Sequence, residues 1–186
     1  MPEEIFDVVD DDDMVIGQEK RSVVHQKGLL HRGVHVWLFS PDGKLLIQRR
    51  TDDRPTAPGA LDCSVSEHVK AGEDYMTAAQ RGLKEELGLE RIELKPVVKF
   101  KMNYAPNDNE ISELFQGKLA DPAQVHFDPV EVKSVGYAEL SELQTWLDEG
   151  LRPFSKWMAQ MLRWTARKSN EMDILRIYGE IGNFPP

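Results

Sequence analysis

The chain has 186 residues, of which 40% are hydrophobic and 30% are charged, so it can build one sizeable core, and a single compact domain is expected. Its formal net charge of −9 argues against a nucleic-acid polymer as partner, because such polymers are held by clustered Lys and Arg. No run approaches the roughly 18 apolar residues of a membrane-spanning helix, and the single cysteine, Cys63, excludes an internal disulfide, so a reducing cytoplasm is the expected location.

The first predicted element is a β-hairpin over residues 34–48. Val34, Val36 and Leu38 alternate with the residues between them, as is typical of a strand. The Ser-Pro-Asp-Gly sequence at 40–43 then supplies turn residues before a second apolar run. A loop punctuated by Pro and Gly and a short strand around 61–65 are expected to follow.

A helix is predicted from about Asp74 to Leu87, ended by Gly88, because glycine favours the left-handed conformation that follows a helix. Further strands are predicted at 96–102, 111–118 and 131–137, and further helices at 141–149 and 153–168. This order of elements predicts an α/β fold in which a mixed β-sheet lies between helices.

The core of the expected single domain, residues 1–186, covers about residues 30–165. It is flanked by an N-terminal extension, residues 1–29, and a C-terminal tail, residues 169–186. No internal repeat or low-complexity linker interrupts the sequence, so no second domain is predicted.

The most informative segment spans residues 73–89. It matches the Nudix box, G-x5-E-x7-R-E-U-x-E-E-x-G-U with U a bulky aliphatic residue, at Glu73, Arg81, Leu83, Glu85, Glu86, Gly88 and Leu89. The segment therefore resembles the Nudix superfamily, which implies an α/β/α sandwich and a divalent-metal-dependent enzyme. Helix positions three and four apart share a face, so Glu85 and Glu86 are expected to bind a hard cation, Mg²⁺ or Mn²⁺.

Two positions depart from the Nudix pattern. Glu67 stands where the box begins with Gly, and Gly82 stands where the box has its first core Glu, a metal ligand in the hydrolases. A glycine inside a helix costs roughly 1 kcal/mol relative to Ala, so we expect it to permit a close approach. Our hypothesis is that Glu67 lies over Gly82 and supplies the missing carboxylate. The alternative is that both changes mark an inactive protein.

Over about residues 4–165 the chain also resembles the Nudix branch that contains type I isopentenyl-diphosphate isomerases and poorly characterised hydrolases. The matching segments are residues 27–32, 48–50, 66–68, 108–110 and 154–158. This resemblance implies a second metal cage formed by His25, His31, His68, Asp108 and Glu110, with His25 one residue out of the isomerase spacing. Imidazoles and carboxylates together suit Zn²⁺ or Mn²⁺.

The isomerase mechanism uses a cysteine to move a proton, and Ser66 stands at that position. Cys63 lies three residues earlier, and an odd offset within a strand points to the opposite face, so we expect Cys63 to be a small buried hydrophobic residue. Trp157 matches the isomerase tryptophan that faces the developing carbocation. A tryptophan on an apolar helix face is also typical of a core.

Three arginines are candidate contacts of a substrate phosphate. Arg50 and Arg54 resemble diphosphate contacts of the isomerases, and Arg81 is the arginine of the Nudix box. Arg49, Lys70 and Lys84 could equally be solvated surface charges.

The function expected from these features is a Nudix hydrolase that cleaves the diphosphate linkage of a small nucleoside-type or other organic diphosphate. Cations held by Glu86, Glu85 and Glu67 would neutralise phosphate charge, and a carboxylate would remove a proton from the attacking water. The alternatives are an isopentenyl-diphosphate isomerase-like enzyme, with Ser66 and Trp157 at catalytic positions, and a catalytically silent diphosphate-binding module. The expected partner is a small molecule and not a membrane, and the protein is expected to be a monomer or a homodimer.

Overall fold

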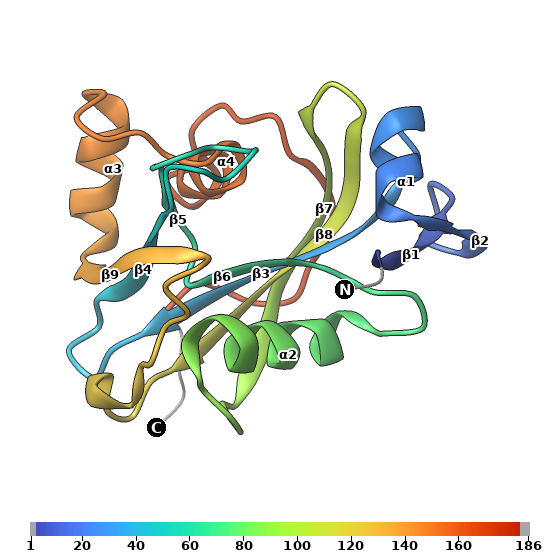
Figure 1. The fold of residues 1–186 in the computed structure, drawn as a ribbon. Coiled ribbons are helices and arrows are strands. Elements are labelled where there is room, and N and C mark those ends of the chain that lie inside the picture. Colours follow the sequence, from blue (N-terminus) through green and yellow to red (C-terminus); the bar gives the residue numbers. More distant parts are fainter. Residues whose placement is uncertain (1–2, 183–186) are drawn as a thin grey trace.

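The computed structural model describes residues 3–182 and builds them around an eight-stranded mixed sheet (Figure 1). Its strands are β3 (His31–Phe39), β4 (Leu45–Arg50), β5 (Leu61–Asp62), β6 (Val65–His68), β7 (Leu94–Ala105), β8 (Asp108–Lys118), β9 (Val132–Ala138) and β10 (Asp173–Ile177). Six strands lie in the order β10-β7-β8-β3-β4-β5, while β6 pairs with β3 and β9 with β4. Strands β3 and β8 run parallel, and the other pairs are antiparallel. The predicted mixed sheet is confirmed.

Helices cover both faces of this sheet (Figure 1). One face carries α2 (Tyr75–Leu87), and the other carries α3 (Leu140–Asp148) and α4 (Lys156–Thr165). A further helix, α1 (Arg21–Lys27), packs against the N-terminal segment, and a short 3-10 turn lies at Pro122–Gln124. Leu83 of α2 packs into the core on one face, and Leu143 of α3 and Met161 of α4 pack into the core on the other. The result is the predicted sandwich of a mixed sheet between helices.

The central strand β3 is buried along most of its length, and its last four residues, 36–39, form a continuous apolar run of the kind expected for a strand covered on both faces. Val34 and Val36 face the core beneath α2, whereas Trp37 and Phe39 face the core beneath α3 and α4. The predicted hairpin is present, with Phe39 opposite Leu45. Strand β3 thus contributes side chains to both cores.

The ends of the helices follow local capping chemistry. The Asp74 side chain accepts a hydrogen bond from the Thr77 N–H at 2.7 Å, and Gly88 ends α2 in the left-handed region with φ 67°. The predicted helix over these residues is confirmed. The last helix begins later than predicted, at Lys156, because the Ser155 hydroxyl caps it by accepting from the Met158 N–H.

The two flanking segments contain elements that the sequence patterns did not indicate. The N-terminal extension forms a two-stranded hairpin of β1 (Ile5–Val9) and β2 (Val15–Lys20), followed by α1. In the C-terminal tail, β10 pairs with β7 and widens the main sheet. The last four residues of that predicted tail, 183–186, lie outside the described residues. Within residues 3–182, no helix has the length and apolar character needed to cross a membrane.

Candidate functional site

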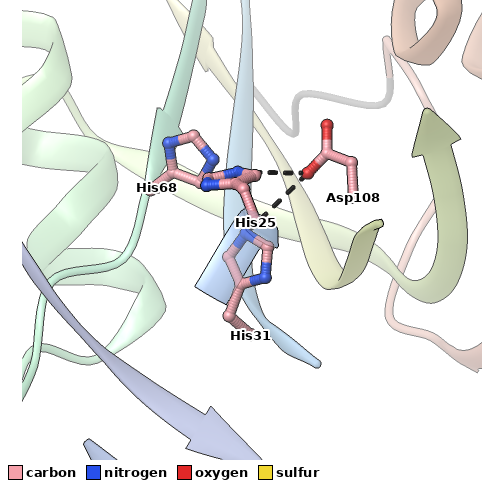
Figure 2. Close-up of side chains that lie close together, drawn as sticks. All are labelled: His25, His31, His68 and Asp108. Atoms are coloured by element: carbon pink, nitrogen blue, oxygen red, sulfur yellow. Dashed lines mark ion pairs between the residues drawn. The ribbon is translucent and has the colours of Figure 1, made fainter. Parts of the chain in front are cut away.

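The first candidate site is a histidine cluster, which we define as His25, His31, His68, Asp108 and Glu110. Figure 2 shows three of its rings gathered around Asp108. The candidate ligand atoms of the three histidines and Asp108 all lie within 4.8 Å of one another. The Nε2 atoms of His25 and His31 lie 3.4 and 3.9 Å from an Asp108 oxygen, and the Nε2 atoms of His31 and His68 lie 3.7 and 3.4 Å from a Glu110 oxygen. The structure therefore brings together all five residues predicted for this cage.

Strand pairing explains how these residues meet. The parallel register places His31 of β3 opposite Glu110 of β8, and the antiparallel register places Gly33 of β3 opposite His68 of β6. A side chain at Gly33 would collide with the Glu110 carboxylate, so glycine there is a condition for the cluster. Helix α1 then brings in His25 from the side.

Backbone carbonyls orient two of the imidazole rings. The Nδ1 atom of His25 lies 2.9 Å from the Arg21 carbonyl oxygen, and that of His31 lies 3.0 Å from the Leu29 carbonyl oxygen. An Nδ1–H donated to a carbonyl leaves Nε2 free to bind a metal, which is the usual outer arrangement of metal-binding histidines.

The electrostatics of the histidine cluster fit a cation. Within residues 3–182, the buried His31 Nε2 and Asp108 Oδ1 atoms have no hydrogen-bond partner, although buried polar atoms are ordinarily paired. Burial lowers the pKa of His31 and lowers the pKa of His68 to about 3, so both rings are neutral at pH 7, as metal binding requires. The nitrogen and oxygen donors suit Zn²⁺ or Mn²⁺.

A phenylalanine that sequence reasoning missed closes this cluster. The fully buried Phe6 of β1 stacks on His31 and His68, with ring centroids 5.5 and 4.8 Å apart. Its only sequence signal is membership in a short apolar run near the N-terminus.

The second candidate site is a carboxylate cluster, which we define as Glu67 of β6, Glu86 of α2 and Glu131, the residue before β9. One oxygen from each lies within 4.8 Å of the others. Glu131 was not predicted as a site residue. It lies far from the Nudix box along the chain, so no helix or strand spacing relates it to the other two carboxylates.

Glu67 lies against Gly82, as the sequence predicts. A Cβ added at Gly82 would lie 2.8 Å from Glu67 Cγ and 2.6 Å from Val65 Cγ1, distances that real Cβ atoms do not adopt. The glycine therefore provides the space in which the Glu67 side chain reaches Glu86.

The electrostatics of the carboxylate cluster are compatible with a bound cation. Burial and the nearby Glu67 charge raise the pKa of Glu86 well above its usual value, and burial raises the pKa of Glu67. One Glu86 oxygen accepts from the Gln48 amide at 2.7 Å, whereas the other, Oε1, is buried and has no hydrogen-bond partner within residues 3–182. An all-oxygen set of this kind suits Mg²⁺ or Mn²⁺.

Glu85 is not part of this group. Its side chain is 51% exposed and accepts a hydrogen bond from Arg81 at 3.1 Å. Arg81 also binds Glu73 and Glu67, and donates to the His68 carbonyl oxygen. Arg81 therefore ties β6 to α2 beside the carboxylate cluster, with several acidic partners already in contact.

The remaining phosphate candidates are ion-paired as well. Arg50 donates to the buried Asp62 at 2.8 Å, and Arg54 lies 3.4 Å from Glu131. Trp157 is buried, donates its indole N–H to Asp62, and packs beneath the Arg50 guanidinium. The Ser66 hydroxyl also lies within hydrogen-bonding distance of Asp62, at 3.3 Å, so Asp62 contacts three of the predicted site residues.

Ser66 is half-buried and lies in a hydrogen-bonded chain with the buried His35. Its hydroxyl lies 3.1 Å from His35 Nδ1, and the other nitrogen of that ring lies 3.0 Å from the Tyr104 hydroxyl. Cys63 is fully buried, as expected, but the expectation that it faces away from Ser66 is wrong. Its sulfur contacts Trp37 and Met158 in the core beneath α3 and α4, the same side as Ser66, because the chain between β5 and β6 interrupts the strand alternation.

Comparison with known proteins matches the NUDIX domain model to residues 29–164. The chain belongs to the Nudix family. It is 40% identical over 102 residues to an uncharacterized Nudix hydrolase of Streptomyces coelicolor, covering 55% of this chain and 56% of that protein. It is 33% identical over 161 residues to Nudix hydrolase 3 of Arabidopsis thaliana, covering 80% of this chain but 21% of that protein.

The chain is also similar to a protein named for another activity and to a solved structure. The chain is 30% identical over 165 residues to an isopentenyl-diphosphate Delta-isomerase of Serratia proteamaculans, covering 87% of this chain and 90% of that protein. A crystal structure of DR0079 from Deinococcus radiodurans superposes with a TM-score of 0.73 at 24% identity, over 87% of this chain and 98% of that one. These matches establish the Nudix fold. They do not identify the substrate, which must be argued from the chemistry of the site.

Proposed function

We propose that this protein is a divalent-metal-dependent Nudix hydrolase that cleaves the diphosphate linkage of a small organic diphosphate. The observation that carries this proposal is the close approach of Glu67, Glu86 and Glu131 over Gly82. The geometry supports relocation of the missing Nudix carboxylate, because a fully decayed site would not retain three converging carboxylates and a glycine that accommodates them.

Each residue of the carboxylate cluster has a role in this proposal. Glu67, Glu86 and Glu131 would hold Mg²⁺ or Mn²⁺, which would neutralise charge on the diphosphate oxygens. Gln48 orients Glu86 through its amide hydrogen bond. A carboxylate of the site would accept the proton that the attacking water loses. Arg54, beside Glu131, lies where it can exchange its carboxylate partner for a phosphate oxygen.

The second candidate function is an isopentenyl-diphosphate isomerase-like activity. Two observations favour it: the histidine cluster is assembled, and the Trp157 ring stacks on the ring of His35, with centroids 6.3 Å apart, where His35 contacts the Ser66 hydroxyl. Ser66 weighs against it, since a serine hydroxyl is far less acidic than a thiol. Solvent deuterium entering isopentenyl diphosphate without phosphate release would favour the isomerase over the hydrolase.

The decisive experiment measures phosphate and monophosphate release from nucleoside and isoprenoid diphosphates with Mg²⁺ or Mn²⁺. We expect release by the wild type and a loss of about a hundredfold or more in Glu86→Gln, because that change removes a charged oxygen ligand. The matched control is Glu90→Gln, whose carboxylate is exposed and pairs with Lys84; it should retain activity. The silent binding module would be indicated if the protein binds the ligand in a metal-dependent way but shows no phosphate release and no deuterium exchange.

A further inference from the structure

A line of polar side chains runs through the protein from the histidine cluster to Ser66. We call it the polar bridge and define it by four residues on four strands: Ser112 of β8, Tyr104 of β7, His35 of β3 and Ser66 of β6. Three of the four are buried, and Ser66 is half-buried. Buried polar groups cost free energy unless they are hydrogen-bonded, so the partners of these side chains indicate what the bridge does.

One end of the polar bridge touches the histidine cluster. The Ser112 hydroxyl donates to a Glu110 oxygen at 3.0 Å and lies 2.9 Å from the Tyr104 hydroxyl. The Tyr104 hydroxyl lies in turn 3.0 Å from His35 Nε2. Glu110 belongs to the histidine cluster, and its other oxygen lies 3.4 Å from His68 Nε2. The polar bridge therefore begins at a candidate cation ligand.

At the other end of the polar bridge, two acceptors compete for one hydrogen. The Ser66 hydroxyl lies 3.1 Å from His35 Nδ1 and 3.3 Å from Asp62 Oδ1. Asp62 Oδ1 already accepts from three other donors, which are the Cys63 N–H, the Ser155 hydroxyl and the Trp157 indole N–H. A carboxylate oxygen has about two lone pairs, so it gains little from a fourth donor. The Ser66 hydrogen is therefore better placed on His35.

The number of hydrogens fixes the direction of each hydrogen bond. From Asp62 to Glu110 there are five contacts, whereas three hydroxyls and a neutral His35 ring supply four hydrogens. Burial lowers the pKa of His35, which keeps its ring neutral at pH 7. A carboxylate that binds a cation can only accept, so the four hydrogens then point in sequence toward Glu110. The contact left without a hydrogen is the longest one, between Ser66 and Asp62.

We propose that His35 is a positioning residue that links the histidine cluster to Ser66. With a cation in that cluster, His35 carries its hydrogen on Nε2 and receives the Ser66 hydrogen on Nδ1. The Ser66 oxygen then presents only lone pairs to its exposed side, so a ligand group that meets it must be a donor, such as a hydroxyl or a water. This role differs from the hydrolysis proposed for the carboxylate cluster and does not depend on it.

The position of the ring hydrogen on His35 is the direct test. Isotopically labelled histidine in the full-length protein, loaded with Zn²⁺, allows proton–nitrogen correlation spectra to distinguish an Nε2–H ring from an Nδ1–H ring. The His35→Gln protein identifies the His35 signal by its loss. We expect the Nε2–H form. The Nδ1–H form would mean that the hydrogen bonds run the other way, and it would overturn the proposal.

Two variants interrupt the polar bridge and leave every candidate cation ligand in place. Tyr104→Phe and Ser112→Ala each remove one hydroxyl between Glu110 and His35. Either change lets Ser66 donate to Asp62 and His35 donate from Nδ1 to Ser66, so we expect the Nδ1–H form in both Zn²⁺-loaded variants. If both retain the Nε2–H form, the bridge does not set the His35 ring and the proposal fails.

The matched control is Ser64→Ala. Ser64 is also fully buried, but its hydroxyl bonds to the backbone of Leu38 and Leu46 and lies outside the polar bridge. The Ser64→Ala protein loses a buried hydroxyl like Ser112→Ala and should keep the Nε2–H form of His35. A change of the His35 ring in this control would show that any buried serine has the same effect, which would also contradict the proposal.

The affinity for Zn²⁺, measured by calorimetry, tests the link from the other end. Ser112 orients Glu110, and loss of an outer partner of a metal ligand lowers affinity by roughly 10–100-fold. We therefore expect Ser112→Ala to bind Zn²⁺ about tenfold more weakly than the wild type, and Ser64→Ala to bind it equally well. Equal Zn²⁺ affinity in wild type and Ser112→Ala would overturn the link to the histidine cluster. Neither readout measures turnover, so both hold whether or not the protein cleaves a diphosphate.

Discussion

At residue 82, a side chain would occupy space that the Glu67 and Val65 side chains now fill. We expect Gly82→Ala to lower the free energy of unfolding by about 1–3 kcal/mol, the usual cost of overpacking a buried site, despite the better helix propensity of alanine. Because Glu67 must move to make room, hydrolysis should fall as well. Urea unfolding and kcat measured on the same sample test both effects.

The double variant Glu67→Gly/Gly82→Glu provides the stricter test at this pair. It places the carboxylate on α2 and removes the side chain that obstructs it, so we expect more activity than in Gly82→Glu alone. If the double variant is no more active than the single variants, a carboxylate at position 82 does not replace the one at position 67, and the relocation hypothesis fails.

His35 gives the stability of the protein a pH dependence. Burial lowers the pKa of His35, so the folded state holds this ring neutral while the unfolded chain protonates it below about pH 6.5. Its contribution is therefore fully present above that pH and is lost as pH falls, by up to about 1.4 kcal/mol per pH unit. We expect His35→Gln to flatten the fall of unfolding free energy between pH 7 and 5, and the exposed His126→Gln to leave it unchanged.

At the scale of elements, β1 and α1 complete the histidine cluster, one through Phe6 and the other through His25. Phe6→Ala should destabilise the protein by about 3–5 kcal/mol, as is typical for a buried Phe, and should lower the metal content of the purified protein. Ile16→Ala on the exposed face of β2 is the control. Unchanged metal content in a folded Phe6→Ala protein would mean that β1 only packs on the cluster.

The elements that sequence reasoning found are those with strong local patterns. β3 and β4 are joined by clear turn residues, and α2 has a cap at Asp74 and a stop at Gly88. β1, β2 and β10 are short and acquire their structure from tertiary pairing, which no local period encodes. The break in alternation near Cys63 has the same origin, since Ser64 bonds across to β3 and β4.

At the scale of the molecule, strand β6 contributes to both clusters: His68 belongs to the histidine cluster and Glu67 to the carboxylate cluster. The histidine cluster was expected from family resemblance and Glu67 from the vacant position at Gly82. Glu131 was missed because its place in the carboxylate cluster depends on how β9 packs beside β4. Local spacing thus predicts ligands within one element, while ligands supplied by distant segments require the folded chain.

Removal of divalent cations should therefore destabilise the whole protein. A cation present at a hundred times its Kd adds about 2.7 kcal/mol, which corresponds to roughly 5–10 °C in Tm for a chain of this size. We expect His31→Gln to abolish the response to Zn²⁺ but to retain that to Mg²⁺, and Glu86→Gln to do the reverse. An identical Tm in EDTA and in excess cation would contradict both cation sites.

The crowding between positions 67 and 82 has a consequence for how such a sequence arises. An ordinary Nudix box has glutamate at position 82 and glycine at position 67. If glutamate appears at position 67 first, two bulky acidic side chains must share one space. If glutamate is lost at position 82 first, the cluster has one carboxylate too few. Each single step is unfavourable, so the two changes are expected to be inherited together. A chain that carries one of them without the other should be rare among functional relatives.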